Sequence, residues 1–337
     1  MKRDAPTIER PSWFDKLTLK ASPIPNETLS DMIERARGTD IACHLILIAG
    51  ALLVCLPLYF AFVAASHTVA EVLTIPFPWL PGDQFFENAR AAWEKGNLGR
   101  LFVNSLIVAL GITIGKIAVS LLSAFAITYF RFRFRMLAFW LIFMSLMLPV
   151  EVRILPTYEA VANATLPLQW LLDVLDVGRW IGALIGRRVE ITVEWNMIDS
   201  YGGLILPLIA SATATFLFRQ FFLTVPEELC EAARIDGASP LRFFWSVLLP
   251  LSTSNMVALA IILFLYGWNQ YLWPLLFTTE PDMATAVIGL KNLIPRSDME
   301  PAWNIAMNAA LLVMLPPVIV VVVLQRWFVK GLVDSSK

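Results

Sequence analysis

The sequence predicts an all-α membrane protein with six transmembrane helices. Of its 337 residues, 58% are hydrophobic and only 16% are charged, which is more apolar surface than a soluble domain buries in an ordinary core. A helix needs about 20 apolar residues to cross roughly 30 Å of hydrocarbon. Six stretches meet this requirement: residues 41–65, 102–129, 136–156, 202–222, 253–277 and 304–325.

The distribution of Lys and Arg predicts the orientation of these helices. With a cytoplasmic N-terminus, the inside segments carry 16 of the 26 Lys and Arg residues, and the outside loops carry 8. The clearest local signal is the short turn between the second and third stretches, which contains Arg131, Arg133 and Arg135. The positive-inside rule therefore predicts that both termini are cytoplasmic.

Residues 1–40 and the long outside loop lie apart from these six helices. The first 40 residues balance seven basic and seven acidic side chains and contain four prolines, which predicts a solvated, partly disordered cytoplasmic tail. In the outside loop, residues 168–186 are apolar, but Asp173, Asp176 and Arg179 argue against a seventh span. We expect an amphipathic surface helix there, then a strand at 188–195. Together they form an extra periplasmic subdomain at about 160–200.

The stretch 224–250 predicts two helices joined by a turn on the cytoplasmic side. Pro226 suits a first helical position, and the two glutamates after it favour the positive end of a helix. Gly237 can adopt the left-handed conformation that ends the first helix. Ser239 before Pro240 is the start signal of the second.

This sequence lacks the residues that several other classes of protein require. Residues 111–116 are one residue short of a phosphate-binding loop and lack the Ser or Thr after Lys116, so we expect no nucleotide site. His44 and His67 have no evident catalytic partner, and the three cysteines have no metal-ligand spacing. A secondary transporter would show internal symmetry between two halves, and none is evident.

A few charged and amide residues lie at membrane depth, where they are costly and usually face a cavity or a partner. Glu151 and Arg153 lie between two prolines at the end of the third stretch, and Asn269 and Gln270 lie in the fifth. Each could hold helices together or line the path of a solute, and Arg153 suits an anionic one. Lys116 has a long side chain that can reach the membrane surface.

The cytoplasmic stretch carries a specific pattern. It reads Glu231-Ala232-Ala233, three residues, Gly237, nine residues, Val247, one residue, Leu249-Pro250. This closely resembles the EAA loop of ABC-importer permeases. The chain also resembles the permeases of carbohydrate importers, above all one permease subunit of bacterial sn-glycerol-3-phosphate importers, over nearly its full length from about residue 42. The matching phrases are residues 121–127, 148–153, 210–222, 231–240, 266–276 and 331–335.

The resemblance implies a type I ABC importer permease fold over residues 41–337. It also implies a complex with a second permease as heterodimer, two ATPase subunits and a periplasmic solute-binding protein in the lipid bilayer, without nucleic acid. The chain would then be a transport subunit with no cofactor of its own, because ATP is hydrolysed by the partner. The residues expected to couple it to the ATPase are Glu231, Ala232, Ala233, Asp236, Gly237 and Pro250.

The first helix of this stretch suits a groove on the ATPase, because Leu229, Ala232 and Ala233 are free to face it and Glu231 adds a charge. The alternative is a loop folded onto its own helical bundle. The implied solute is sn-glycerol-3-phosphate, with a glycerophosphodiester or an oligosaccharide as alternatives. The loop at about 165–197 resembles an insertion relative to the family, and the N-terminal tail is longer than usual.

Overall fold

The computed structural model describes residues 37–145, 147–148, 150–176, 195–294 and 302–334. Within these ranges every regular element is a helix or a helical turn. The chain divides into two compact units, residues 1–60 and 61–337. Nearly all of the expected N-terminal tail and, apart from Trp195, the expected strand at 188–195 lie outside the described residues.

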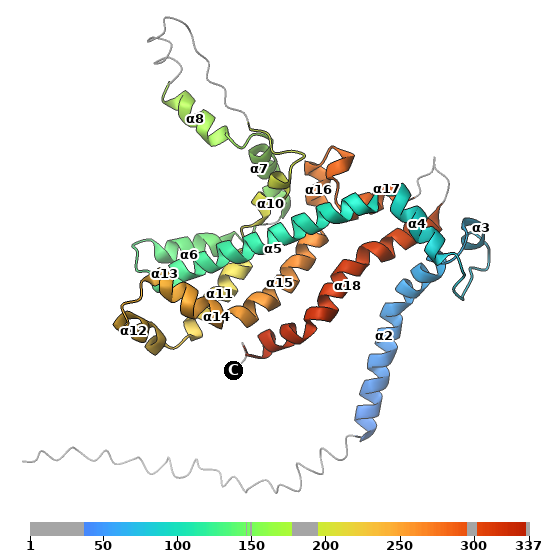
Figure 1. The fold of residues 1–337 in the computed structure, drawn as a ribbon, viewed down its shortest axis with the longest axis horizontal. Coiled ribbons are helices and arrows are strands. Elements are labelled where there is room, and N and C mark those ends of the chain that lie inside the picture. The colour runs from blue at the N-terminus through green and yellow to red at the C-terminus, as the bar shows by residue number, and fades with distance from the viewer. Residues whose placement is uncertain (1–36, 146, 149, 177–194, 295–301, 335–337) are drawn as a thin grey trace, which may run out of the picture. The chain divides into compact units, whose positions relative to one another are not determined.

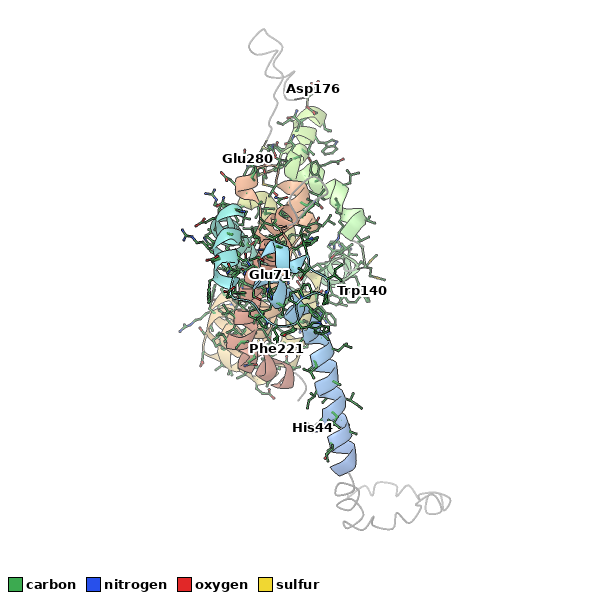
Figure 2. All side chains as sticks on the ribbon, turned by 90° about the vertical axis from the view of Figure 1, so that its right-hand side faces the viewer. His44, Glu71, Trp140, Asp176, Phe221 and Glu280 are labelled. Carbon is green, nitrogen blue, oxygen red and sulfur yellow. The ribbon has the colours of Figure 1, made fainter. Side chains whose placement is uncertain are left out.

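The described part of the first unit belongs to helix α2 (Arg37–Ala65). Its apolar side chains are exposed within the chain, among them Leu45, Ile46 and Leu53. Figure 2 shows side chains projecting from this helix around the labelled His44. A helix that is apolar on all sides requires an apolar environment, so α2 has the character expected for the first predicted span.

The second unit is built around the long helix α5 (Leu98–Tyr129) (Figure 1). The other described α-helices of this unit are α3 (Val69–Val72), α4 (Phe85–Lys95), α6 (Arg135–Met144), α7 (Val150–Ala162), α8 (Leu166–Val174), α10 (Tyr201–Ile205), α11 (Ala212–Thr224), α12 (Glu227–Ile235), α13 (Pro240–Phe243), α14 (Leu249–Leu251), α15 (Thr253–Trp268), α16 (Leu272–Phe277), α17 (Ala286–Leu293) and α18 (Trp303–Asp334). Shorter turns are the 3-10 turns η1 (Leu206–Leu208) and η3 (Pro281–Met283) and the π-helical turn η2 (Phe244–Leu248).

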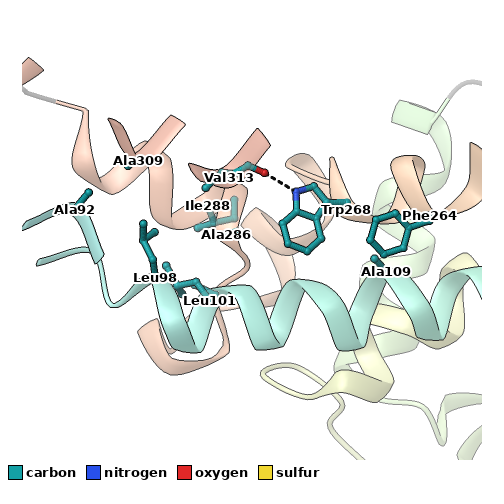
Figure 3. Packing of buried hydrophobic residues seen from close by; sticks show 11 residues of the cluster. Ala92, Leu98, Leu101, Ala109, Phe264, Trp268, Ala286, Ile288, Ala309 and Val313 are labelled. Carbon is teal, nitrogen blue, oxygen red and sulfur yellow. Dashed lines mark hydrogen bonds between the residues drawn. The ribbon is translucent and has the colours of Figure 1, made fainter. Parts of the chain in front are cut away.

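Helix α15 packs between α5 and α18 and forms the centre of the core. Trp268, at the end of α15, is 2% exposed and stacks on Phe264 while its edge meets Phe102 of α5. Its indole N–H donates a hydrogen bond of 3.1 Å to the carbonyl oxygen of Val313 in α18 (Figure 3). This bond satisfies the only polar atom of a large buried side chain and ties three helices together.

Glycines allow the closest approaches of helices to α5. A Cβ atom added to Gly267 of α15 would lie 2.9 Å from the Cα atom of Ala109, so the two backbones are in contact there. A Cβ atom added to Gly111 would lie 2.5 Å from Cδ1 of Ile205, and one on Gly115 would overlap Ile209. These two glycines, four residues apart on α5, thus leave room for the segment around η1 to approach closely.

Among the described residues, three helices are long and apolar enough to cross a membrane: Asp40–Ala65, Leu98–Tyr129 and Trp303–Gln325. Two bent pairs could supply two more spans: Tyr201–Leu208 with Ala212–Thr224, bent by 47°, and Pro240–Leu251 with Thr253–Trp268, bent by 71°. The expected single helix at 136–156 is instead divided, because α6 ends at Met144 and α7 begins at Val150. Pro149 has no N–H to donate to a preceding turn, which disfavours one continuous helix.

Hydrogen bonds join the residues around the start of α10 and the segment that follows α16 to each other and to the start of α5. The amide of Asn104 donates to the carbonyl oxygens of Asp282 and Ala284 at 2.8 and 2.9 Å, and accepts a 2.7 Å bond from the Tyr201 hydroxyl. The carboxylate of Asp199 accepts bonds from the backbone N–H groups of Thr279 and Glu280 at 2.6 and 2.9 Å. These bonds lie at the end of α5 opposite the α12–α13 turn.

The helix expected at 168–186 is present in part. Helix α8 covers Leu166–Val174, and residues 177–194 lie outside the described residues. Trp170 of α8 is 66% exposed, which agrees with an apolar helix that has few neighbours within the chain.

Candidate functional site

Two helices and a tight turn form the α12–α13 hairpin, residues 227–243. The N–H of Ala238 donates to the carbonyl oxygen of Ala233 at 2.9 Å, and the N–H of Gly237 donates to that of Arg234 at 3.0 Å. This pair of bonds is a Schellman motif, which requires a left-handed residue, and Gly237 has φ 71°. The Ser239 hydroxyl then caps the next helix by accepting from the N–H of Arg242. The expected two-helix turn is confirmed, although Pro226 is the residue before α12 and not its first residue.

The two faces of α12 have different surroundings. Cys230 and Ala233, three residues apart, pack against the chain's own buried cluster that includes Phe222 and Phe243. The opposite face is exposed and presents Ile235, whose side chain is 86% exposed. Ala233 therefore faces the bundle and not a partner, contrary to the expectation that it is free to face a groove.

The other residues expected to couple the chain to an ATPase have open positions. Glu231, Ala232, Asp236 and Gly237 are exposed on or beside α12. A Cβ atom added to Gly237 meets no atom of the described residues within 4 Å. Ile235 was not singled out from the sequence, but its position on the polar side of an amphipathic helix is a signal that the sequence contains.

Pro250 lies apart from the turn, in α14, where its side chain is exposed. A proline cannot donate to the carbonyl four residues earlier, and the π-helical turn η2 directly precedes α14. The chain then bends by 71° between Pro240–Leu251 and Thr253–Trp268. The hairpin is thus joined directly to α15, the central helix of the core.

A cavity of about 620 Å³ lies among α5, α6, α7, α11 and the segment that joins α15 to α16. Its walls combine apolar side chains with hydroxyl, amide and basic groups. The residues that line it are Lys116, Val119, Ser123, Leu141, Ile142, Ser145, Arg153, Ile154, Thr157, Pro207, Leu208, Ala210, Ser211, Ala212, Thr213, Thr215, Tyr266, Gln270, Leu272 and Trp273. A mostly apolar pocket with a few convergent polar groups is typical of a small-molecule site.

Lys116 reaches this cavity from the middle of α5. Its side chain is only 7% exposed, and Nζ lies 3.7 Å from the centroid of the Tyr266 ring. A long side chain can reach the membrane surface, but the structure places that of Lys116 inside the bundle. The signal was present: Val119 and Ser123 follow at three and seven residues, which puts all three on one helix face.

The four residues expected on a solute path have different positions. Arg153 and Gln270 line the same cavity, although they are distant in sequence. Asn269 is exposed at the C-terminal end of α15 and is not among the lining residues. Glu151 belongs to α7, but its side chain lies outside the described residues.

Comparisons with known proteins agree in one family. Residues 111–334 match the family described as "Binding-protein-dependent transport system inner membrane component". The sn-glycerol-3-phosphate transport system permease protein UgpE of Yersinia pestis bv. Antiqua (strain Antiqua) is 50% identical over 312 residues, with 91% of this chain and all of the relative covered. The protein of the same name in Pectobacterium atrosepticum is 51% identical over 312 residues, with the same coverage.

A solved structure supports the fold. One chain of the structure described as "Crystal structure of a bacterial ABC transporter involved in the import of the acidic polysaccharide alginate" matches with a TM-score of 0.67. The match covers 87% of this chain and 98% of that chain, at 18% identity. With this family match and with relatives that it matches over their full length, the chain belongs to the family of binding-protein-dependent transport system inner membrane components, the permeases of ABC importers.

Proposed function

We propose that this chain is a permease subunit of an ATP-driven importer for sn-glycerol-3-phosphate. The observation that carries the proposal is 50% identity to a sn-glycerol-3-phosphate permease over that protein's whole length. The cavity that contains Lys116 and Arg153 supports an anionic solute, because basic groups at membrane depth attract negative charge. Family membership removes the secondary transporter as an alternative.

The rest of the importer supplies energy and captures the solute. In the proposed complex, this chain pairs with a second, different permease, two ATPase subunits and a periplasmic solute-binding protein. ATP is hydrolysed by the ATPase, and this chain has no cofactor and catalyses no reaction of its own. Both termini face the cytoplasm, as the Lys and Arg distribution favours.

The α12–α13 hairpin transmits the motion of the ATPase to the membrane helices. Glu231, Ala232, Asp236 and Ile235 present the exposed face that would enter a groove on the ATPase. Pro250 belongs to the bent connection that leads from the hairpin into α15. A shift of the hairpin would therefore move α15, which carries Tyr266 at the cavity. This link gives ATP-driven closure a route to the solute path.

Solute identity is tested in the complete importer, reconstituted in vesicles with its second permease, ATPase and binding protein. We expect sn-glycerol-3-phosphate to stimulate ATP hydrolysis and to accumulate in an ATP-dependent way. A glycerophosphodiester and a neutral oligosaccharide of similar length are the matched comparisons. Stronger stimulation by either of these, with no uptake of sn-glycerol-3-phosphate, would replace the proposed solute.

A further inference from the structure

Two basic side chains share the cavity, and none of the described side chains that line it is a carboxylate. Lys116 of α5 and Arg153 of α7 both line it, and the described lining residues include no Asp or Glu. Within the described part of the chain, neither Lys116 nor Arg153 takes part in an ion pair. A bound anion would be attracted to both cations.

Tyr266 holds Lys116 in position without neutralising it. The lysine ammonium lies 3.7 Å from the centroid of the Tyr266 ring, an attraction between a cation and an aromatic face. The ring leaves the charge in place, and the ammonium keeps N–H donors for a ligand. Because Lys116 is only 7% exposed, the rotamers of its side chain are restricted before a solute binds.

The break in the fourth span brings a third positive element to the same cavity. Ser211, Ala212 and Thr213, at the start of α11, all line it. Ser211 is fixed there, because its hydroxyl accepts from the N–H of Ala214 and its carbonyl accepts from the Ser120 hydroxyl at 3.3 Å. The first turn of a helix carries partial positive charge and N–H groups without partners in the helix. Interrupted membrane helices direct such ends at anionic solutes.

We propose that Lys116, Arg153 and the first turn of α11 form the subsite that holds the phosphate group of a phosphomonoester while the solute crosses the membrane. The inference rests on the proposed function and assigns its solute a defined orientation. The guanidinium of Arg153 can bind two phosphate oxygens at once, and Lys116 supplies a point charge. A phosphomonoester carries about −1.5 to −2 charges at pH 7, so it matches two cations better than a singly charged diester.

The first test measures uptake by the complete importer as a function of solute concentration. We expect Lys116→Met and Arg153→Met each to lower the maximal rate of sn-glycerol-3-phosphate uptake about tenfold, because each loses one charge-assisted contact. The half-saturating concentration stays the same, since the binding protein captures the solute first. Lys116→Arg keeps the charge and most of the rate. Wild-type rates in both Met variants would overturn the proposal.

Lys291 provides a matched control. Its ammonium also lies over an aromatic ring, 5.8 Å from the centroid of Tyr271, but it does not line the cavity. Lys291→Met therefore removes a similar cation without touching the subsite, and wild-type uptake is expected. A tenfold loss in this variant as well would mean that removing any such lysine slows transport, which would also overturn the assignment.

A second measurement does not depend on transport. In an importer in which Cys43, Cys55 and Cys230 are replaced by Ser, a Thr213→Cys variant presents one thiol to the cavity. We expect inorganic phosphate and sn-glycerol-3-phosphate to slow its reaction with a small thiol reagent, and Lys116→Met to remove this protection. Equal protection with and without Lys116 would overturn the subsite. If the wild-type importer takes up no sn-glycerol-3-phosphate, the proposed function fails, while protection by inorganic phosphate still tests the subsite.

Discussion

The α12–α13 hairpin turn is shaped by residues close together in the sequence, whereas the cavity is formed by residues far apart in the sequence. The bonds that shape the hairpin turn join residues no more than five positions apart, such as Ala238 to Ala233. The cavity joins side chains as distant as Lys116 and Trp273, from helices that meet only after the bundle has packed. The hairpin can therefore keep its shape when its surface is altered, whereas the cavity depends on the exact approach of α15 to α5.

The strongest expected effect is at the turn of the hairpin. Gly237 has φ 71°, a conformation that costs about 1–2 kcal/mol for other residues, and an added side chain would point into open space. We expect Gly237→Trp to insert and assemble but to abolish solute-stimulated ATP hydrolysis, because the indole would occupy the surface that meets the ATPase. Gly237→Ala has the same backbone cost without the bulk and should retain coupling in part. Normal uptake of sn-glycerol-3-phosphate by the Gly237→Trp variant in vesicles would contradict the coupling role of the hairpin.

An intermediate effect is expected where α15 touches α5. A Cβ atom at position 267 would lie 2.9 Å from the Cα atom of Ala109, and a backbone neighbour cannot turn aside as a side chain can. We expect Gly267→Ala to destabilise the bundle by about 1–3 kcal/mol and to slow uptake, since it moves the neighbouring Tyr266 away from Lys116. Thermal unfolding of the purified complex and uptake rate are measured together.

Gly202→Ala is the matched control for this packing contact. Its added Cβ would lie 3.6 Å from the nearest atom, the Ser200 hydroxyl oxygen, which is an ordinary distance. We expect wild-type stability and uptake. Equal stability of the Gly202→Ala and Gly267→Ala variants would contradict the view that close backbone contact of α5 and α15 maintains the cavity.

The same contrast between local and distant contacts explains what could be predicted from the sequence. The hairpin was predictable because Gly237, Ser239 and Pro240 act on their immediate neighbours. Likewise, α5 and the end of α2 follow from the length of an apolar run alone. Which face of α12 meets the bundle was not predictable, because Cys230 and Ala233 are as small and apolar on a helical wheel as the exposed Ala232.

The cavity was predictable only in fragments. Arg153 and Gln270 are recognisable in the sequence as polar residues at membrane depth. Nothing near them in the sequence shows that they line the same cavity. The position of Lys116 could not be predicted, because a long side chain on a single helix can either reach the membrane surface or turn into the bundle. Only the packing of α15 against α5 places the Tyr266 ring next to the Lys116 ammonium. The breaks in the third and fourth spans also depend on how neighbouring helices replace the backbone bonds that prolines remove.

The smallest effect is expected in the loop that follows α2, where a local contact lies outside both regions. The ring of His67 bonds to the carbonyl oxygen of Leu80 at 2.9 Å and to the Glu71 carboxylate at 3.1 Å. The carbonyl of Leu80, chiefly, and the Glu71 carboxylate raise the pKa of His67 above 6.5 against the opposing effect of burial. Backbone N–H donation by Thr68, chiefly, and the contact with His67 lower the pKa of Glu71 below 4.5.

These shifts set the sign of a pH dependence. The contribution of His67 is complete below pH 6.5 and is lost as the pH rises through its raised pKa, and that of Glu71 is lost only as the pH falls through its lowered pKa. Hydrogen exchange at the backbone N–H of Gly82, which donates to the Ser66 hydroxyl at 2.9 Å, should therefore show slightly less protection at about pH 8 than at about pH 6 after correction for intrinsic rates. His67→Gln should remove the difference while leaving protection in α12 unchanged. Protection at Gly82 that is independent of pH in the wild-type chain would show that the contacts of His67 with Leu80 and Glu71 do not hold the loop.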